Sequence, residues 1–234
     1  QGISAELIAA RWGLDRDDLD VYAALSHARA SAADFGSEIL PIGNLSTDET
    51  IRPGTSADGL AGLSPAFFDQ QIADRFPEIT WRVTAGNSSP LTDGASAVLI
   101  MSEERSAAFG LTPRARFHSF AVVGSDPIEM LTGIIPATHR VLARSGIRLD
   151  QLDSIEVNEA FASVALAWLH EFPVDPALVN PRGGAIALGH ALGSSGTRLL
   201  TTLVNHLDAT GGRYGLHVMC EGGGMANATL IERF

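Results

Sequence analysis

A glycine-rich stretch near the end of this chain constrains its fold more than any other feature. Residues 180–196 contain five glycines and one histidine, His190, and the apolar run 197–207 follows at once. Glycines at this density do not fill a core; they let the backbone approach another group closely or adopt a positive φ. A histidine just before a helix lies beside unpaired N–H groups and the positive end of the helix dipole. This setting suits developing negative charge and disfavours the imidazolium form.

Two further stretches place a reactive polar group at the end of a strand-like segment. Asn158 begins Asn-Glu-Ala-Phe-Ala after the strand-like residues 155–157, and a helix is expected to follow. Cys220 begins Cys-Glu-Gly-Gly-Gly after the strand-like residues 216–219. Each group therefore stands where a sheet passes its chain to a turn.

Composition excludes several classes of protein. The 234 residues, 45% hydrophobic and 18% charged, suit an ordinary globular protein with one large core or two small ones. The net charge of −11 argues against nucleic-acid binding, and no apolar run is long enough for a membrane span. One cysteine excludes an internal disulfide and predicts a reducing, cytoplasmic location. The seven histidines are scattered, so no metal site is expected.

Elements of both kinds alternate along the chain, which predicts an α/β sheet with mixed strand direction at its end. Ser4 is expected to cap a helix over 5–11, and Asp15 a longer helix that buries Leu19, Tyr22 and Ala23. Residues 36–77 contain too many turn formers for long elements, which is typical of a binding loop or lid. The other elements expected are strands at 95–101, 115–123, 152–157, 179–180, 214–219 and 225–231, and helices at 102–110, 136–146, 159–171 and from 197.

Taken in order, Asn-Glu-Ala-Phe, Gly-His-x-x-Gly-x-x-Gly and Cys-x-Gly-Gly-Gly resemble the C-terminal half of thiolases, which make or break the carbon–carbon bond of 3-ketoacyl-CoA. Residues 84–94, Thr-Ala-Gly-Asn-Ser-Ser-Pro-Leu-Thr-Asp-Gly, are a further thiolase-like stretch. The resemblance implies a layered αβαβα fold with an irregular helical loop domain. It implies a loop-domain remainder at 1–92, a segment returning to an absent N-terminal domain at 93–112, and the C-terminal domain at 113–234.

The resemblance also implies catalytic roles. His190 would help to deprotonate a nucleophilic cysteine and donate a hydrogen bond to the thioester oxygen, while Asn158 holds a water that donates a second one. Cys220 would act as acid/base, with a thiol near its ordinary pKa of about 8.5. The N–H of Gly222 would belong to a second oxyanion hole.

Three residues are expected to contact coenzyme A or acyl-CoA, which bind as substrate; no other cofactor is implied. By resemblance, Arg52 lies near the nucleotide phosphates, and Ser89 meets the pantetheine arm. Phe161 would form pocket wall or core. A solvated surface arginine and a self-bonded polar turn are the alternative interpretations of Arg52 and Ser89.

One departure from the family is serious, because thiolases form their acyl-enzyme on a cysteine in the N-terminal half and this chain has none there. We therefore expect an N-terminal thiolase half to complete the site, with residues 95–101 pairing with its strands. The resemblance further implies a homo-oligomer of thiolase units that acts in fatty acid degradation.

Other interpretations remain open. The chain could be a thiolase-like scaffold or CoA-binding subunit without turnover, although Asn158, His190 and Cys220 together weigh against it. A cysteine hydrolase using Cys220 and His190 lacks a means to activate water. A ketosynthase would have a second histidine where Cys220 stands.

Overall fold

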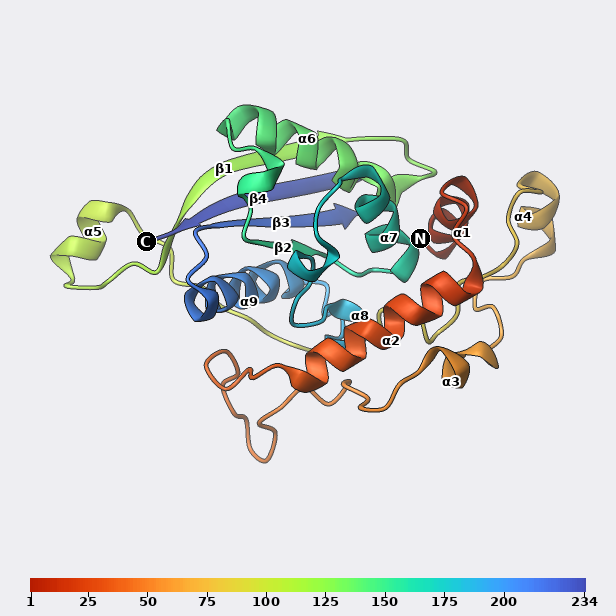
Figure 1. Cartoon of the computed structure of the whole chain (residues 1–234), viewed down its shortest axis with the longest axis horizontal. Coiled ribbons are helices and arrows are strands. Elements are labelled where there is room, and N and C mark those ends of the chain that lie inside the picture. The colour runs from red at the N-terminus through yellow and green to blue at the C-terminus, as the bar shows by residue number, and fades with distance from the viewer.

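Four strands form one mixed sheet at the centre of the computed structural model, which describes residues 1–234 (Figure 1). Their order is β1-β4-β3-β2, in which β4 pairs antiparallel with β1 and β3, whereas β2 and β3 are parallel. The mixed α/β sheet predicted from the sequence is confirmed. The strands are β1 (Ala115–Gly124), β2 (Ser154–Val157), β3 (Tyr214–Glu221) and β4 (Met225–Arg233).

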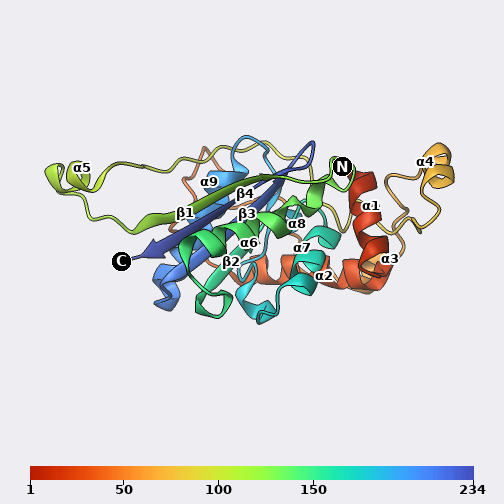
Figure 2. The same ribbon diagram turned by 90° about the horizontal axis from the view of Figure 1, so that it is seen from above.

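Helices cover both faces of this sheet: α6 lies on one face with α7 beside it, and α9 lies along the other (Figures 1 and 2). Alternate residues of a strand point to opposite faces. Leu216 and Val218 of β3 therefore join the core under α6, whereas a Cβ on Gly215 would lie 2.9 Å from Leu203 of α9. The helices are α1 (Gly2–Arg11), α2 (Arg16–Ala32), α3 (Ala57–Ala61), α4 (Gln70–Arg75), α5 (Glu103–Ala108), α6 (Ile134–Ser145), α7 (Ala162–Glu171), α8 (Ala185–Leu188) and α9 (Ser195–Thr210).

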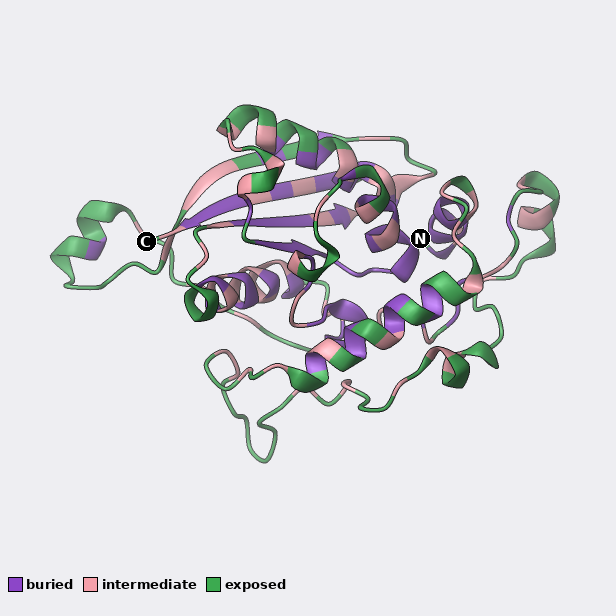
Figure 3. Ribbon diagram, viewed as in Figure 1, coloured by how far each residue is buried: buried purple, intermediate pink, exposed green.

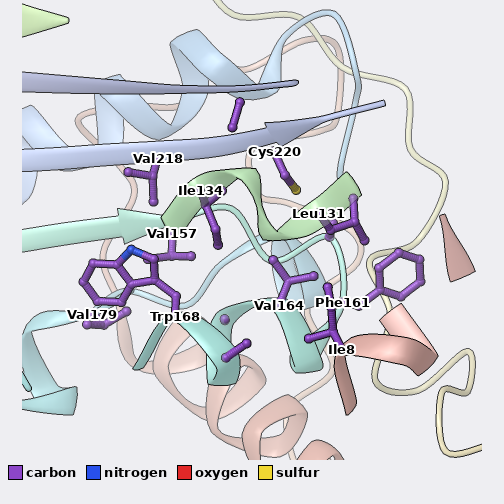
Figure 4. Packing of buried hydrophobic residues seen from close by; sticks show 14 of the residues in the cluster. Ile8, Leu131, Ile134, Val157, Phe161, Val164, Trp168, Val179, Val218 and Cys220 are labelled. Carbon is purple, nitrogen blue, oxygen red and sulfur yellow. The ribbon is translucent and has the colours of Figure 1, made fainter. Parts of the chain in front are cut away.

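The main core lies between the sheet and α1, α6 and α7, where the buried residues of Figure 3 concentrate. Ile8 of α1, Ile134 of α6 and Trp168 of α7 are at most 1% exposed and all belong to this core (Figure 4). The indole Nε1 of Trp168 donates to Thr138 Oγ1 at 2.9 Å, so its one polar atom is satisfied in the core.

The long helix α2 begins as the sequence predicts. The Asp15 carboxylate accepts from the Asp18 N–H and the Asp18 carboxylate from the Asp15 N–H, a reciprocal cap that satisfies two donors. Leu19, Tyr22 and Ala23 are buried, as expected. The expected Ser4 cap of the first helix is wrong: α1 already begins at Gly2. The Ser4 hydroxyl instead accepts from the Leu131 N–H at 3.4 Å, because it lies inside the helix against the core.

Residues 36–77 are irregular apart from the short helices α3 and α4, as predicted. No helix in the chain combines the length and apolar character that crossing a membrane requires. No group of three or more His, Cys, Asp or Glu side chains is gathered where it could hold a metal ion.

Residues 95–101 do not form the expected strand. They run as an extended strap toward α5, which projects from one end of the molecule (Figures 1 and 2). Leu99 is 79% and Ile100 62% exposed, while the Ser96 hydroxyl anchors the strap by donating to the Ser194 carbonyl at 2.6 Å. A strand needs a hydrogen-bonded neighbour, and this chain supplies none at the strap. Pairing of the strap with strands of an N-terminal half stays a prediction.

Candidate active site

The ends of β2 and β3 bring Asn158 close to the segment that carries Cys220. These two strands run parallel, with Val157 opposite Val218. The Asn158 N–H then extends the ladder by donating to the Val218 carbonyl at 3.0 Å. Asn158 therefore lies at the edge of the sheet where β3 reaches Cys220, because parallel strands end on the same side.

The side chain of Asn158 is buried without partners. The residue is 1% exposed, and neither its amide nitrogen nor its amide oxygen makes a hydrogen bond. Such a group costs free energy unless a water or ligand pairs with it. An uncharged amide left free at this position can hold a polar molecule in a fixed orientation.

Cys220 lies in the core, and its sulfur points toward the segment carrying Leu131 and Ile134 (Figure 4). Burial raises the pKa of its thiol to about 12, because a thiolate would be desolvated there. The expectation of an ordinary pKa near 8.5 is therefore wrong for this chain. As folded here, Cys220 holds its proton at neutral pH.

Gly222 begins the tight turn between β3 and β4. Its neighbours Gly223 and Gly224 have φ values of +79° and +86°, which strain other residues. A Cβ on Gly224 would lie 2.7 Å from the Ser125 carbonyl oxygen. None of the hydrogen bonds of the turn uses the Gly222 N–H. The turn therefore presents a free donor beside the carboxyl end of β3.

His190 is held in place by its surroundings at two points. Its N–H donates to Thr92 Oγ1 at 3.3 Å, and its Nδ1 lies 2.7 Å from Ser195 Oγ. Gly189 precedes it with φ of +84°, and a Cβ there would lie 2.4 Å from Thr92 Oγ1. Burial lowers the pKa of His190, and the positive charge of Arg198 lowers it further. The imidazole is thus held neutral, as the sequence predicts.

The predicted catalytic residues fall into two groups. His190 opens into a cavity that Asn158, Cys220 and Gly222 do not line. These three lie at the ends of the strands, as described above. The walls of the His190 cavity are Leu91, Thr92, Asp93 and Leu192.

Arg52 lines a second cavity, of about 220 Å³, between segments that are far apart in the sequence. Its walls come from His27 of α2, residues 50–60, residues 85–90 and Ile186 of the glycine-rich stretch. The N–H of Arg52 donates to His27 Nδ1 at 3.2 Å, and burial lowers the pKa of His27, with Arg52 adding to the effect. The lining of the cavity thus contains the positively charged guanidinium of Arg52 and the uncharged imidazole of His27.

Ser89 stands between two lining residues in the sequence and Phe161 forms an isolated β-bridge with Ser88, but neither lines this cavity. Ser88 and Pro90 line it, whereas the Ser89 hydroxyl donates to the Ala160 carbonyl at 3.0 Å. Phe161 is 8% exposed and packs edge-to-face on Phe67 with ring centroids 5.8 Å apart. In this structure Phe161 is core, and Ser89 fastens the 85–90 segment to the start of α7.

Sequence reasoning assigned no role to Glu159, whose buried carboxylate joins three segments of the chain next to Asn158. Its carboxylate accepts from Tyr22 at 3.0 Å, Ser26 at 2.6 Å, Asn180 at 3.0 Å and the Ile186 N–H at 3.1 Å. These bonds join the end of β2 to α2 and to the glycine-rich stretch. In the sequence, Glu159 is only an acidic residue between an expected strand and an expected helix. No sequence pattern connects it with Tyr22 and Ser26, which are more than 130 residues away.

A sheet covered by helices on both faces, with polar groups at its strand ends, defines a layered α/β protein. Residues 1–104 match the model of the thiolase N-terminal domain, and residues 111–233 that of the thiolase C-terminal domain. The chain belongs to the thiolase family.

Two curated relatives match nearly the whole chain. Steroid 3-ketoacyl-CoA thiolase FadA6 of Mycobacterium tuberculosis is 46% identical over 98% of this chain and 55% of its own length. A 3-ketoacyl-CoA thiolase of Vibrio cholerae is 45% identical over 99% of this chain and 62% of its own length. This chain therefore spans between half and two thirds of these relatives.

Solved structures agree with the family. Human mitochondrial 3-ketoacyl-CoA thiolase in complex with CoA matches with a TM-score of 0.92 and 38% identity, over 99% of this chain and 58% of that one. Acetyl-CoA acetyltransferase of Bacillus anthracis matches with a TM-score of 0.91 and 34% identity, over 100% of this chain and 60% of that one. The α/β thiolase-like fold expected from the sequence is confirmed.

Proposed function

We propose that this chain carries the acid/base and oxyanion part of an acetyl-CoA C-acyltransferase site. Completed by a segment with a nucleophilic cysteine, it cleaves 3-ketoacyl-CoA with coenzyme A to acyl-CoA and acetyl-CoA, or runs the reverse condensation. The observation that carries the proposal is the neutral His190, fixed at two points beside a cavity. A neutral imidazole can take a thiol proton and then donate to an oxyanion.

The residues at the strand ends supply the other groups. The unpartnered Asn158 amide would hold a water aimed at the thioester oxygen. The free N–H of Gly222 would stabilise a second oxyanion. Cys220 would return a proton to the acetyl enolate in the cleavage direction, a task for which a protonated thiol is suited. In condensation the same thiol must lose its proton, so binding of substrate has to lower its pKa.

Coenzyme A is proposed to bind at the Arg52 cavity. A guanidinium is suited to phosphate oxygens. Arg52 shares the cavity lining with Pro90 and with Ile186, which stands four residues before His190 in the sequence. At about 220 Å³ the cavity is smaller than the pockets that enclose drug-sized ligands, so it would hold one part of the coenzyme. Ser89 and Phe161 would act by shaping this wall from behind.

The chain alone should show no thiolysis of acetoacetyl-CoA, because it lacks the nucleophile. Activity should appear when the N-terminal segment of a full-length relative is added, and acyl transfer to that segment can be followed by intact mass. In the completed enzyme, Cys220→Ser should slow carbon–carbon cleavage far more than acylation. His190→Asn should slow both steps, by about 10² to 10⁴ each. Turnover by the chain alone, or an acyl group retained on Cys220, would overturn the proposal.

A CoA-binding subunit without turnover is the second candidate. It is favoured by the pKa of Cys220, which burial raises to about 12. Calorimetry would then show coenzyme A binding that Arg52→Met weakens, while the completed mixture stays inactive.

A further inference from the structure

Ser195, the first residue of α9, is 2% exposed and lies against His190. Its hydroxyl oxygen makes two short contacts. One joins it to His190 Nδ1 at 2.7 Å, and the other to the Ala191 carbonyl oxygen at 2.9 Å. The direction of the first hydrogen bond decides which ring nitrogen of His190 carries the proton.

A proton count settles that direction. A serine hydroxyl has one proton and two lone pairs, whereas a carbonyl oxygen can only accept. If Ser195 donated to Nδ1, its oxygen would face the Ala191 carbonyl oxygen at 2.9 Å with no proton between them. If Ser195 donates to Ala191, it accepts from Nδ1–H, and both contacts are attractive. The second arrangement is the one that both distances support.

The Thr92 hydroxyl holds the backbone of His190 in the same way, as a hydrogen-bond acceptor. It donates to the Pro90 carbonyl at 2.9 Å and accepts from the His190 N–H. Each hydroxyl thus has its own proton committed elsewhere and offers His190 a lone pair. The closeness of Thr92 to Gly189 leaves no room for a side chain there. Both the backbone and the ring of His190 are therefore fixed by acceptors.

We propose that Ser195 is a positioning residue that holds His190 in the Nδ1–H tautomer, leaving Nε2 as the proton-accepting atom. The consequence for catalysis rests on the proposed function. When Nε2 takes the proton of the nucleophilic thiol, the imidazolium that forms keeps its Nδ1–H bond to Ser195. The ring then needs no rotation before its new Nε2–H donates to the thioester oxygen, so no reorganisation separates the two roles.

The tautomer can be measured on this chain without any activity, by long-range proton–nitrogen correlation NMR of the protein with ¹⁵N-labelled histidine at pH 7.5. We expect the Nδ1–H form of His190 to exceed the Nε2–H form by about fivefold to tenfold, the preference that one hydrogen bond confers. Ser195→Ala should abolish that preference, and Ser195→Thr should restore it. A dominant Nε2–H form in the unaltered chain overturns the proposal, even if Ser195→Ala does not fold.

Thr201→Ala is the matched control. Thr201 also lies in α9, and its hydroxyl donates to the carbonyl four residues back, Thr197, at 2.8 Å. Its hydroxyl makes no hydrogen bond to a histidine, so its loss should leave the tautomer ratio unchanged. A similar shift in Thr201→Ala would mean that helix stability, rather than the Ser195 contact, sets the ratio.

In the completed enzyme, Ser195→Ala should lower kcat by about 10- to 100-fold with little change in KM. The reason is that His190 in the wrong tautomer slows proton transfer in the chemical step but does not affect substrate binding. Equal losses in kcat of Ser195→Ala and Ser195→Thr would contradict the role. If the tautomer behaves as expected and the completed enzyme is inactive, the proposed function fails while the positioning by Ser195 stands.

Discussion

Two glutamates three residues apart, Glu156 and Glu159, are equally buried but differ in the hydrogen bonds that their carboxyl groups make. Glu156 is in β2 and 0% exposed, and neither of its carboxyl oxygens has a hydrogen-bond partner. Glu159 follows β2 and is 1% exposed, and it accepts four hydrogen bonds. Burial is the same, so the difference between them lies in the donors that the fold provides.

Burial raises the pKa of both carboxyls, because the charged form loses its hydration. For Glu156 the pKa rises to about 8, so this residue is neutral at pH 7. For Glu159 the hydrogen bonds from Ser26, Ile186, Tyr22 and Asn180 oppose the rise. Burial near the end of β2 is therefore not enough to give a glutamate a role in the fold. Glu159 has such a role because four hydrogen-bond donors converge on its carboxylate.

The neighbours of Glu156 show the same lack of pairing. His217 lies opposite it on β3, and burial lowers the pKa of that imidazole to about 4. The terminal nitrogens of Arg198, on α9, are also buried without partners. This face of the sheet thus holds three ionisable side chains that make no hydrogen bond with one another.

The largest effect should come from removing Glu159. Glu159→Ala leaves the Tyr22, Ser26 and Asn180 donors unpaired and should lower the free energy of unfolding by about 3 to 5 kcal/mol in urea titrations. Glu156→Ala is the matched control and should cost less than about 2 kcal/mol at pH 6, since no hydrogen bond is lost. Equal losses in the two variants would mean that packing, not hydrogen bonding, distinguishes them.

A pH dependence of intermediate size should come from Glu156. Its pKa in the folded chain is raised, so between about pH 4.5 and 8 the folded state binds more protons than the unfolded state. Its contribution to stability is complete below pH 4.5 and is lost as the pH rises through 8. From pH 6.5 to 8 the free energy of unfolding should therefore fall by about 1.5 to 2 kcal/mol, and Glu156→Gln should remove this fall.

His217 acts in the opposite sense at lower pH. Its depressed pKa means that stability rises with pH from about 4 to 6.5, where Glu156 makes it fall. The two slopes nearly cancel in that window, so the Glu156 slope is best seen above pH 6.5. Parallel stability curves for Glu156→Gln and the unaltered chain in that range would refute the assignment of the raised pKa to Glu156.

The smallest effect tests one of the four donors. Tyr22→Phe removes the hydroxyl that donates to Glu159 and accepts from Asn180 Nδ2, and it should cost about 1 to 2 kcal/mol. Combined with Glu159→Ala, the same substitution should cost much less, because its main partner is already gone. Additive losses in this double-mutant cycle would show that Tyr22 stabilises the chain independently of Glu159.

Much of the fold could be predicted because residues close together in the sequence determine where each helix and strand forms. The Asp15–Asp18 cap, the buried face of α2 and the order of strands and helices all follow from residues within a few positions of each other. The strand expected at 95–101 failed for the opposite reason. Its apolar run is real, but a strand also needs a hydrogen-bonded neighbour, and this chain places none beside it.

The sequence by itself determined which chemical groups the site contains and at which ends of elements they stand: Asn158 after β2, Cys220 at the end of β3, and His190 before α9. Only the tertiary structure decided how buried Cys220 is and what anchors the glycine-rich stretch. The pKa of Cys220 comes from the core packed around it. The anchoring of the glycine-rich stretch comes from Glu159, which accepts from Asn180 and the Ile186 N–H and also from Ser26 of α2, 133 residues away. Desolvation and hydrogen bonding depend on distance in space, which spacing along a chain does not specify.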